Sequence, residues 1–109
     1  MTKRTDGIWI IDAEARTLYA NAAMGEILAA DSARLIGKSS FEYLFSEDVE
    51  AAQRLFQSKQ RGQASPFHFR LRRADGSAIW VDVQGTPMHC ADGNFLGIVG
   101  TFSVPAQQG

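Results

Sequence analysis

The sequence predicts an α+β fold in which two strands, several helices and three further strands follow one another along the chain. A continuous apolar run at residues 7–12 is typical of a buried strand. Residues 46–62 carry the start and stop signals of a helix. Apolar and polar residues alternate on both sides of a turn at residues 74–76, as in an antiparallel hairpin. The 109 residues suffice for one hydrophobic core and not for two, so one domain is expected.

The composition is that of an ordinary globular protein, with 45% hydrophobic and 21% charged residues. The net charge of −1 gives no reason to expect nucleic acid as a partner, and no apolar stretch approaches the roughly 18 residues of a membrane span. Cys90 is the only cysteine, so no internal disulfide can form and a cytoplasmic location is expected. The polar ends divide the chain into an N-terminal extension (1–6), a folded domain (7–104) and a C-terminal tail (105–109).

Four short elements are expected after the first strand. Residues 17–20 form a short strand that returns antiparallel, and Asn21 caps the helix behind it through its side-chain oxygen. Ser32 is expected to cap a second helical turn, which Gly37 ends. Residues 39–42 have the capping-box spacing for a third.

The clearest helix of the chain is expected at residues 46–62. Acidic residues occupy its first turn and basic residues its last, so both ends complement the helix macrodipole, and Gly62 stands just beyond. One stripe of this helix is mostly apolar and consists of Val49, Ala52, Gln53 and Phe56.

The register of the hairpin around residues 74–76 follows from burial. A two-residue turn would mix polar and apolar side chains on both faces of the pair, whereas a three-residue loop with Gly76 left-handed shifts the pairing by one and gives one apolar face. The predicted partners are then Phe67 with Val83, Phe69 with Val81, Leu71 with Ile79, His68 with Asp82, and Arg70 with Trp80.

A second Ala-Asp-Gly loop at residues 91–93 leads into the last strand. The same loop geometry predicts that Gly97, Val99 and Thr101 lie on the inner face of the sheet. The outer face then carries an apolar patch, which we predict to be a homodimer interface or the docking site of a flanking helix. Its residues are Trp80, Leu96, Ile98 and Phe102, with Met88 beside them.

The order and spacing of these segments resemble the PAS family. The segments that carry the resemblance are Asp6-Gly-Ile-Trp-Ile-Ile-Asp12, Leu18-Tyr-Ala-Asn21, Leu35-Ile-Gly37, Ser46-Glu-Asp48, Arg70-Leu-Arg-Arg-Ala-Asp75-Gly76 and Asp92-Gly-Asn-Phe-Leu-Gly97. The resemblance covers nearly the whole chain. It implies a five-stranded antiparallel sheet with helices packed over one face, around a small core or cavity.

The resemblance also implies a function. PAS modules sense ligands, light or oxygen, or mediate dimerisation, in histidine kinases, cyclic-nucleotide enzymes and transcription regulators. We therefore predict a non-catalytic sensory or dimerisation module of a signal-transduction protein, linked to an effector domain outside this chain. A small apolar ligand in its core is a further expectation.

The family's cofactors are not expected in this chain. Flavin-binding light sensors place a reactive cysteine in the short helices after Gly37, where this chain has Lys38-Ser-Ser-Phe, and a glutamine on the last strand, where Val99 stands. Haem-binding members commonly use a histidine of the long helix, and residues 46–62 contain none. Of the two histidines, His68 is predicted to point outward, away from any cavity.

Interior side chains could line a ligand pocket or simply form the core. Pockets for drug-sized ligands measure about 300–1,000 Å³, which is large for this domain, so a filled core is the favoured interpretation. If a ligand binds, Tyr19, Tyr43 and Thr101 are the polar groups expected to orient it. The remaining candidate lining residues are Met24, Ile27, Leu28, Phe41, Leu44, Phe56, Phe67, Phe69, Val81, Val83 and Val99.

The alternative interpretation is a small cone-shaped α+β enzyme, such as an isomerase or hydratase, with an apolar active-site cavity. Such an enzyme needs a buried general base beside a positioned Tyr or Asp donor. Most carboxylates of this chain fall in turns, at helix starts or on exposed faces, and no metal-ligand spacing is present. A buried carboxylate near Tyr19 or Tyr43 would favour the enzyme.

Overall fold

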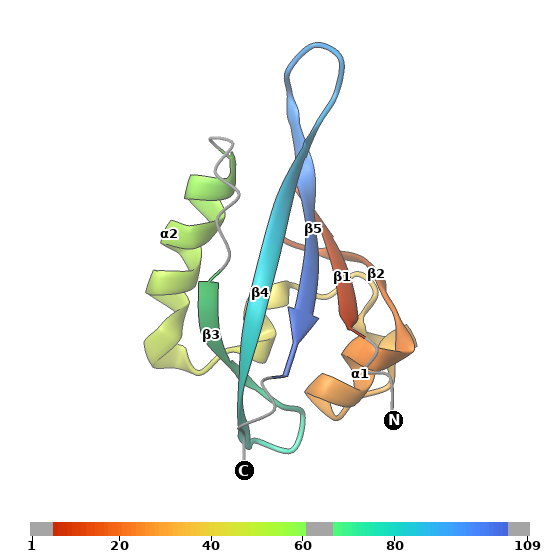
Figure 1. Ribbon diagram of the computed structural model, residues 1–109, viewed down its shortest axis with the longest axis vertical. Coiled ribbons are helices and arrows are strands. Elements are labelled where there is room, and N and C mark those ends of the chain that lie inside the picture. The colour runs from red at the N-terminus through yellow and green to blue at the C-terminus, as the bar shows by residue number, and fades with distance from the viewer. Residues whose placement is uncertain (1–5, 61–66, 105–109) are drawn as a thin grey trace.

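The computed structural model describes residues 6–60 and 67–104 and confirms the predicted α+β fold. Five strands form one antiparallel sheet in the order β2-β1-β5-β4-β3 (Figure 1). The strands are β1 Gly7–Asp12, β2 Thr17–Ala20, β3 Phe67–Arg72, β4 Ala78–His89 and β5 Phe95–Ser103. The helices are α1 Ala22–Leu28 and α2 Val49–Gln60, with the 3-10 turns η1 Ser32–Leu35, η2 Ser40–Tyr43 and η3 Ser46–Asp48 between them.

The core lies between this sheet and the helical segment that joins β2 to β3. Side chains from β1, β3 and β4 meet those from α1 and from the turns that follow it. In Figure 1, α2 stands beside β3 at one side of the sheet, and α1 lies beside β1 and β2 at the other. The most completely buried large side chains are Met24, Leu28, Leu35 and Val81.

Side-chain caps position the short helices. Oδ1 of Asn21 accepts hydrogen bonds from the N–H of Met24 (2.9 Å) and of Ile8 (3.0 Å), so the predicted N-cap is confirmed and also ties α1 to β1. Oγ of Ser39 accepts from the N–H of Phe41 at 3.2 Å and caps η2 as predicted.

The predicted cap at Ser32 is wrong by one residue. Asp31 caps η1, and its carboxylate accepts from the N–H of Ala33 at 3.0 Å, because Ser32 is already the first residue of the turn. The long helix begins with the 3-10 turn η3 and becomes α-helical at Val49. Its predicted end at Gly62 lies outside the described residues.

The register predicted for the first hairpin is confirmed at every pair. Phe69 lies opposite Val81, and Arg70 lies opposite Trp80. The loop has the predicted three residues, because the N–H of Arg73 donates to the carbonyl of Ser77 (2.8 Å) and Gly76 has φ +91°.

The register predicted for the second hairpin is wrong by one residue. Its loop is as expected, since the N–H of Cys90 donates to the carbonyl of Asn94 at 2.9 Å and His89 pairs with Phe95. A β-bulge follows at once, so that Met88 pairs with Gly97 rather than with Leu96. An inserted residue moves every later side chain of the strand to the other face of the sheet.

This slip reverses the predicted faces of β5. Ile98 and Phe102, predicted on the outer face, lie on the inner one, where Phe102 pairs with Val83 and Ile98 is only 8% exposed. Val99 and Thr101, predicted inside, lie on the outer face opposite the exposed side chains of Thr86 and Gln84. Trp80 and Leu96 are exposed, as predicted.

Candidate functional site

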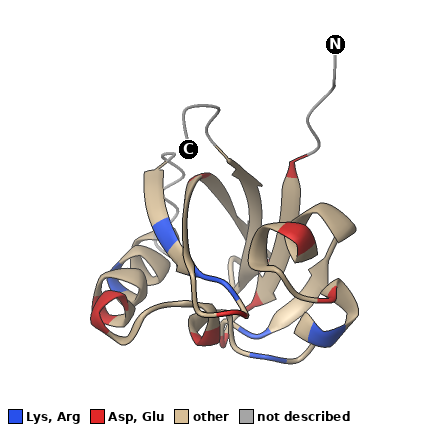
Figure 2. Ribbon diagram, turned by 90° about the horizontal axis from the view of Figure 1, so that it is seen from below, with Lys and Arg blue, Asp and Glu red and all other residues tan. Residues whose placement is uncertain are grey.

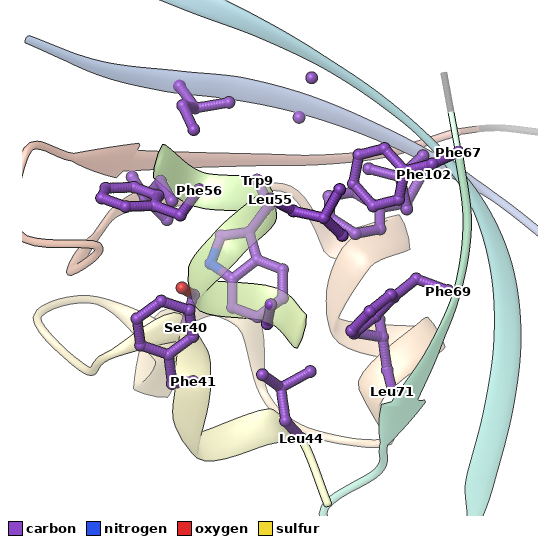
Figure 3. A pocket seen from close by; sticks show the side chains of 16 residues that line it. Trp9, Ser40, Phe41, Leu44, Leu55, Phe56, Phe67, Phe69, Leu71 and Phe102 are labelled. Atoms are coloured by element: carbon purple, nitrogen blue, oxygen red, sulfur yellow. The ribbon is translucent and has the colours of Figure 1, made fainter. Parts of the chain in front are cut away.

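An apolar cavity lies between the inner face of the sheet and the helical segment. Its volume is about 120 Å³. In Figure 3, Ser40 and Phe41 lie on one side of it, and Phe69 and Leu71 on the opposite side. The described residues that line it are Trp9, Ile11, Ser40, Phe41, Leu44, Ala52, Leu55, Phe56, Phe67, Phe69, Leu71, Val83, Gly85, Ile98, Gly100 and Phe102.

The predicted pocket residues fall into three groups. Six of them line the cavity: Phe41, Leu44, Phe56, Phe67, Phe69 and Val83. Five others belong to the buried core without lining the cavity: Met24, Ile27, Leu28, Tyr43 and Val81. The last three, Tyr19, Val99 and Thr101, lie on the outer face, where Tyr19 pairs with Ile10 and is 48% exposed. These three cannot orient a ligand in this cavity.

The sequence analysis missed several cavity residues. Ile98 and Phe102 were assigned to the outer face because the bulge was not foreseen. Trp9 and Ile11 alternate with Ile8 and Ile10 in a run that is apolar at every position, so the pattern does not show which pair points inward. The other missed lining residues are Ser40, Ala52, Leu55, Leu71, Gly85 and Gly100.

The described wall of the cavity offers almost no polar chemistry. The indole N–H of Trp9 donates to Oγ1 of Thr17 at 2.8 Å, and that hydroxyl donates onward to the carbonyl of Lys38 at 3.0 Å. Ser40 therefore supplies the one uncommitted hydroxyl among the described lining residues, none of which carries a carboxyl, imidazole or thiol. This wall can bind a neutral apolar molecule, and its described part contains no acid–base catalyst.

Aromatic rings dominate the wall. Trp9 packs against Phe102 with ring centroids 5.7 Å apart, and Phe67 meets Phe69 edge-to-face at 6.2 Å. Phe41 meets Phe56 of α2 edge-to-face at 6.1 Å. Strands, turn and helix thus each contribute rings to the same space.

Ion pairs hold the helical side of the cavity to β3. The guanidinium of Arg70 donates from Nε to Asp48 at 2.9 Å and from a terminal nitrogen to Glu47 at 3.2 Å, and it lies over the ring of Phe45. The hydrogen bonds to Asp48 and then Glu47 raise the pKa of Arg70. Arg72 donates to the backbone carbonyls of residues 42 and 44 and so braces the turn between η2 and η3.

The outer face of the sheet is a second candidate site. Figure 2 shows charges of both signs on helices, on connecting segments and on some of the strands. The sequence of β5 contains no charged residue. The ring of His68 stacks on Trp80 with centroids 5.0 Å apart, and its Nδ1 lies 2.9 Å from a carboxylate oxygen of Asp82. Tyr19 and Trp80 are about half exposed there.

Cys90 stands apart from the cavity, at the start of the β4–β5 loop. Hydrogen bonds from the backbone N–H groups of Asn94 and Asp92 lower the pKa of its thiol. Within residues 6–60 and 67–104, no group of three or more His, Cys, Asp or Glu side chains is placed to hold a metal ion. No helix in the described part of the chain is long and apolar enough to cross a membrane.

Comparison with known proteins identifies the family. The family model described as PAS fold matches residues 4–104. The chain belongs to the PAS family, as its sequence motifs indicated. PAS domains are sensory modules typical of signalling proteins and are generally not catalytic themselves.

Solved structures show the same fold at low sequence identity. A PAS domain from Colwellia psychrerythraea has a TM-score of 0.85 at 16% identity, over 94% of this chain and 88% of that one. A PAS-B domain of Drosophila melanogaster Cycle, with bound glycerol, has a TM-score of 0.80 at 18% identity, over 91% and 99%.

One curated protein is similar in sequence. It is the uncharacterized protein y4lL of Sinorhizobium fredii, which is 29% identical over 94 residues. The match covers 85% of this chain and only 11% of that protein. This chain therefore corresponds to one small part of its relative.

Proposed function

We propose that this chain is the sensory module of a larger cytoplasmic signalling protein, such as a histidine kinase or transcription regulator, and that its cavity binds a small apolar ligand. Catalysis would then reside in an effector domain outside this chain. The match to 11% of a much longer relative supports a place within a multidomain protein.

The observation that supports a bound ligand is the cavity itself. Side chains leave about 120 Å³ unfilled between the sheet and the helices. Apolar side chains that border such a space lack packing partners on one side. A bound apolar ligand would supply those contacts and would stabilise the folded state by mass action.

The volume of the cavity can be compared with the size of the two cofactors known in the family, flavin and haem. Drug-sized pockets begin at about 300 Å³, more than twice the volume found here. A flavin or a haem is larger than this volume, and the described lining residues include no His, Cys or Met to ligate haem iron. The proposal therefore includes neither cofactor.

A cavity-filling substitution tests the ligand proposal. Ala52 of α2 lines the cavity, whereas its neighbour Ala51 is exposed on the same helix. Benzene, as a probe, should shift the methyl NMR signals of Ile11, Leu44 and Ile98 in the unchanged protein. Ala52→Leu should abolish these shifts by occupying the space, and Ala51→Leu should leave them intact. Absence of shifts in the unchanged protein with benzene and also with phenol would refute the proposal.

The natural ligand can be sought directly. Protein purified from its own host should show, in native mass spectrometry, a mass that disappears on denaturation. The Ala52→Leu variant should lack that mass, and the Ala51→Leu variant should keep it.

The proposal also includes a homodimer through the outer face of the sheet. Its supporting residues differ from those predicted, because Ile98 and Phe102 point inward. Tyr19, Trp80 and Leu96 are about half exposed, and half-buried Val99 lies in the same row of the sheet as Tyr19, with Ile10 between them. Val99→Glu should convert a sedimenting dimer into monomers, and Ala74→Glu in the exposed first loop should not. Equal sedimentation of both variants and the unchanged protein would exclude this interface.

A further inference from the structure

We propose that the cavity is selective for a neutral ligand with a single aromatic ring and one hydroxyl group, and that Oγ of Ser40 hydrogen-bonds that hydroxyl. This inference rests on the proposed function, since it names the ligand class of the same cavity. Size, wall chemistry and the position of one uncommitted hydroxyl each contribute to it.

The volume limits the ligand to about one ring. A cavity of about 150 Å³ lined by Leu, Ile and Phe side chains accommodates benzene, and the present cavity, at about 120 Å³, is of similar size. A second fused ring would extend beyond this space on the side that is open to solvent, where it would gain fewer contacts with the wall.

The wall favours an aromatic molecule over an aliphatic one of equal volume. Six aromatic side chains from β1, η2, α2, β3 and β5 border the space: Trp9, Phe41, Phe56, Phe67, Phe69 and Phe102. Rings gain about 0.5–1.5 kcal/mol beyond area burial when they meet in offset or edge-to-face geometry. Several of these side chains already meet one another in that way, so an inserted ring finds both faces and edges.

Ser40 supplies a specific polar contact. Its backbone N–H donates to the carbonyl of Ala15 at 2.8 Å, which holds the residue in place. The capping role at η2 belongs to Ser39, so the Ser40 hydroxyl is not needed there and has no hydrogen-bond partner among the described residues. A serine hydroxyl can donate and accept, which suits a ligand hydroxyl.

The described residues around the cavity offer no counter-charge to an ionised ligand. The described lining residues carry no charge. The nearby guanidinium of Arg70 already pairs with Asp48 and Glu47, and the guanidinium of Arg72 donates to backbone carbonyls. Burying a charge without a partner costs several kcal/mol or more. A carboxylated ring should therefore be rejected.

Four probes and two variants test this inference. Dissociation constants for benzene, phenol, benzoate and 1-naphthol are measured by NMR titration of the cavity methyl groups. The decisive quantity is the ratio of the benzene constant to the phenol constant, because it cancels effects on the cavity as a whole. A net hydrogen bond corresponds to a factor of about 3 to 10, so Ser40→Ala should lower this ratio by that factor. Ser40→Thr keeps the hydroxyl and should restore the ratio.

The outcomes separate the two proposals. A lowered ratio in Ser40→Ala, its restoration in Ser40→Thr and rejection of benzoate and 1-naphthol support the inference. The inference is overturned if the ratio is unchanged in Ser40→Ala, or if benzoate or 1-naphthol binds as tightly as phenol. In either case, binding of benzene still supports the proposed function. If neither benzene nor phenol shifts the cavity methyl groups, both proposals fall.

Discussion

The two hairpins of this protein have the same turn but differ in how their strands pair. Each turn is Ala-Asp-Gly, each closes a three-residue loop, and the two glycines have φ of +91° and +88°. Beyond the first loop the strands pair without interruption, whereas beyond the second a bulge at Leu96 and Gly97 shifts β5 by one residue.

The difference shows how far a turn controls register. Turn chemistry sets the pairing only as far as the first irregularity. In the second hairpin the shift places Ile98 and Phe102 under the helices and turns Val99 and Thr101 outward. Burial of the larger apolar side chains therefore accounts for the observed register better than the turn does.

The largest effect should come from the bulge itself. Gly97 has φ +153°, and a Cβ there would overlap the carbonyl oxygen of Ile11 on the neighbouring strand. Gly97→Ala should lower the free energy of unfolding by about 3 kcal/mol or more, because β1 and β5 must separate. Urea denaturation measures the loss, with Gly93→Ala in the open turn as control. Equal losses in the two variants would contradict the role assigned to the bulge.

A medium effect should distinguish the two faces of β5. Ile98→Ala removes a buried side chain and should cost about 2–4 kcal/mol. Val99→Ala, on the outer face, should cost about 1 kcal/mol or less. Denaturation at low protein concentration, where dimers dissociate, measures both. The reverse order would support the register expected from the turn alone.

The smallest effect should show that the turns are equivalent. Gly76 and Gly93 both have positive φ and open space around their Cα atoms. Alanine at either position should cost about 1–2 kcal/mol, the penalty of a left-handed conformation. The two losses, measured by urea denaturation, should agree within experimental error. A larger gap would mean that the bulge strains its turn.

The candidate site was predicted in part. Phe67, Phe69 and Val83 were assigned to the cavity because alternation and a clean turn placed them on one face. Val99 and Thr101 were misassigned because no local signal marks the bulge before them. Ser40 was missed because the capping-box spacing of residues 39–42 indicates only the start of a helix. Its position beside the cavity depends on the hydrogen bond from its N–H to the carbonyl of Ala15.

Local chemistry in the sequence determined the elements, their order, the caps at Asn21 and Ser39 and the complete register of the first hairpin. These features depend on residues close in the chain or on a simple alternation. Only the tertiary structure decided which face of β5 is buried and that about 120 Å³ stays unfilled between sheet and helices. Both follow from how strands distant in sequence fit together, since Gly97 must pass close to Ile11 and the rings that border the cavity come from five separate elements.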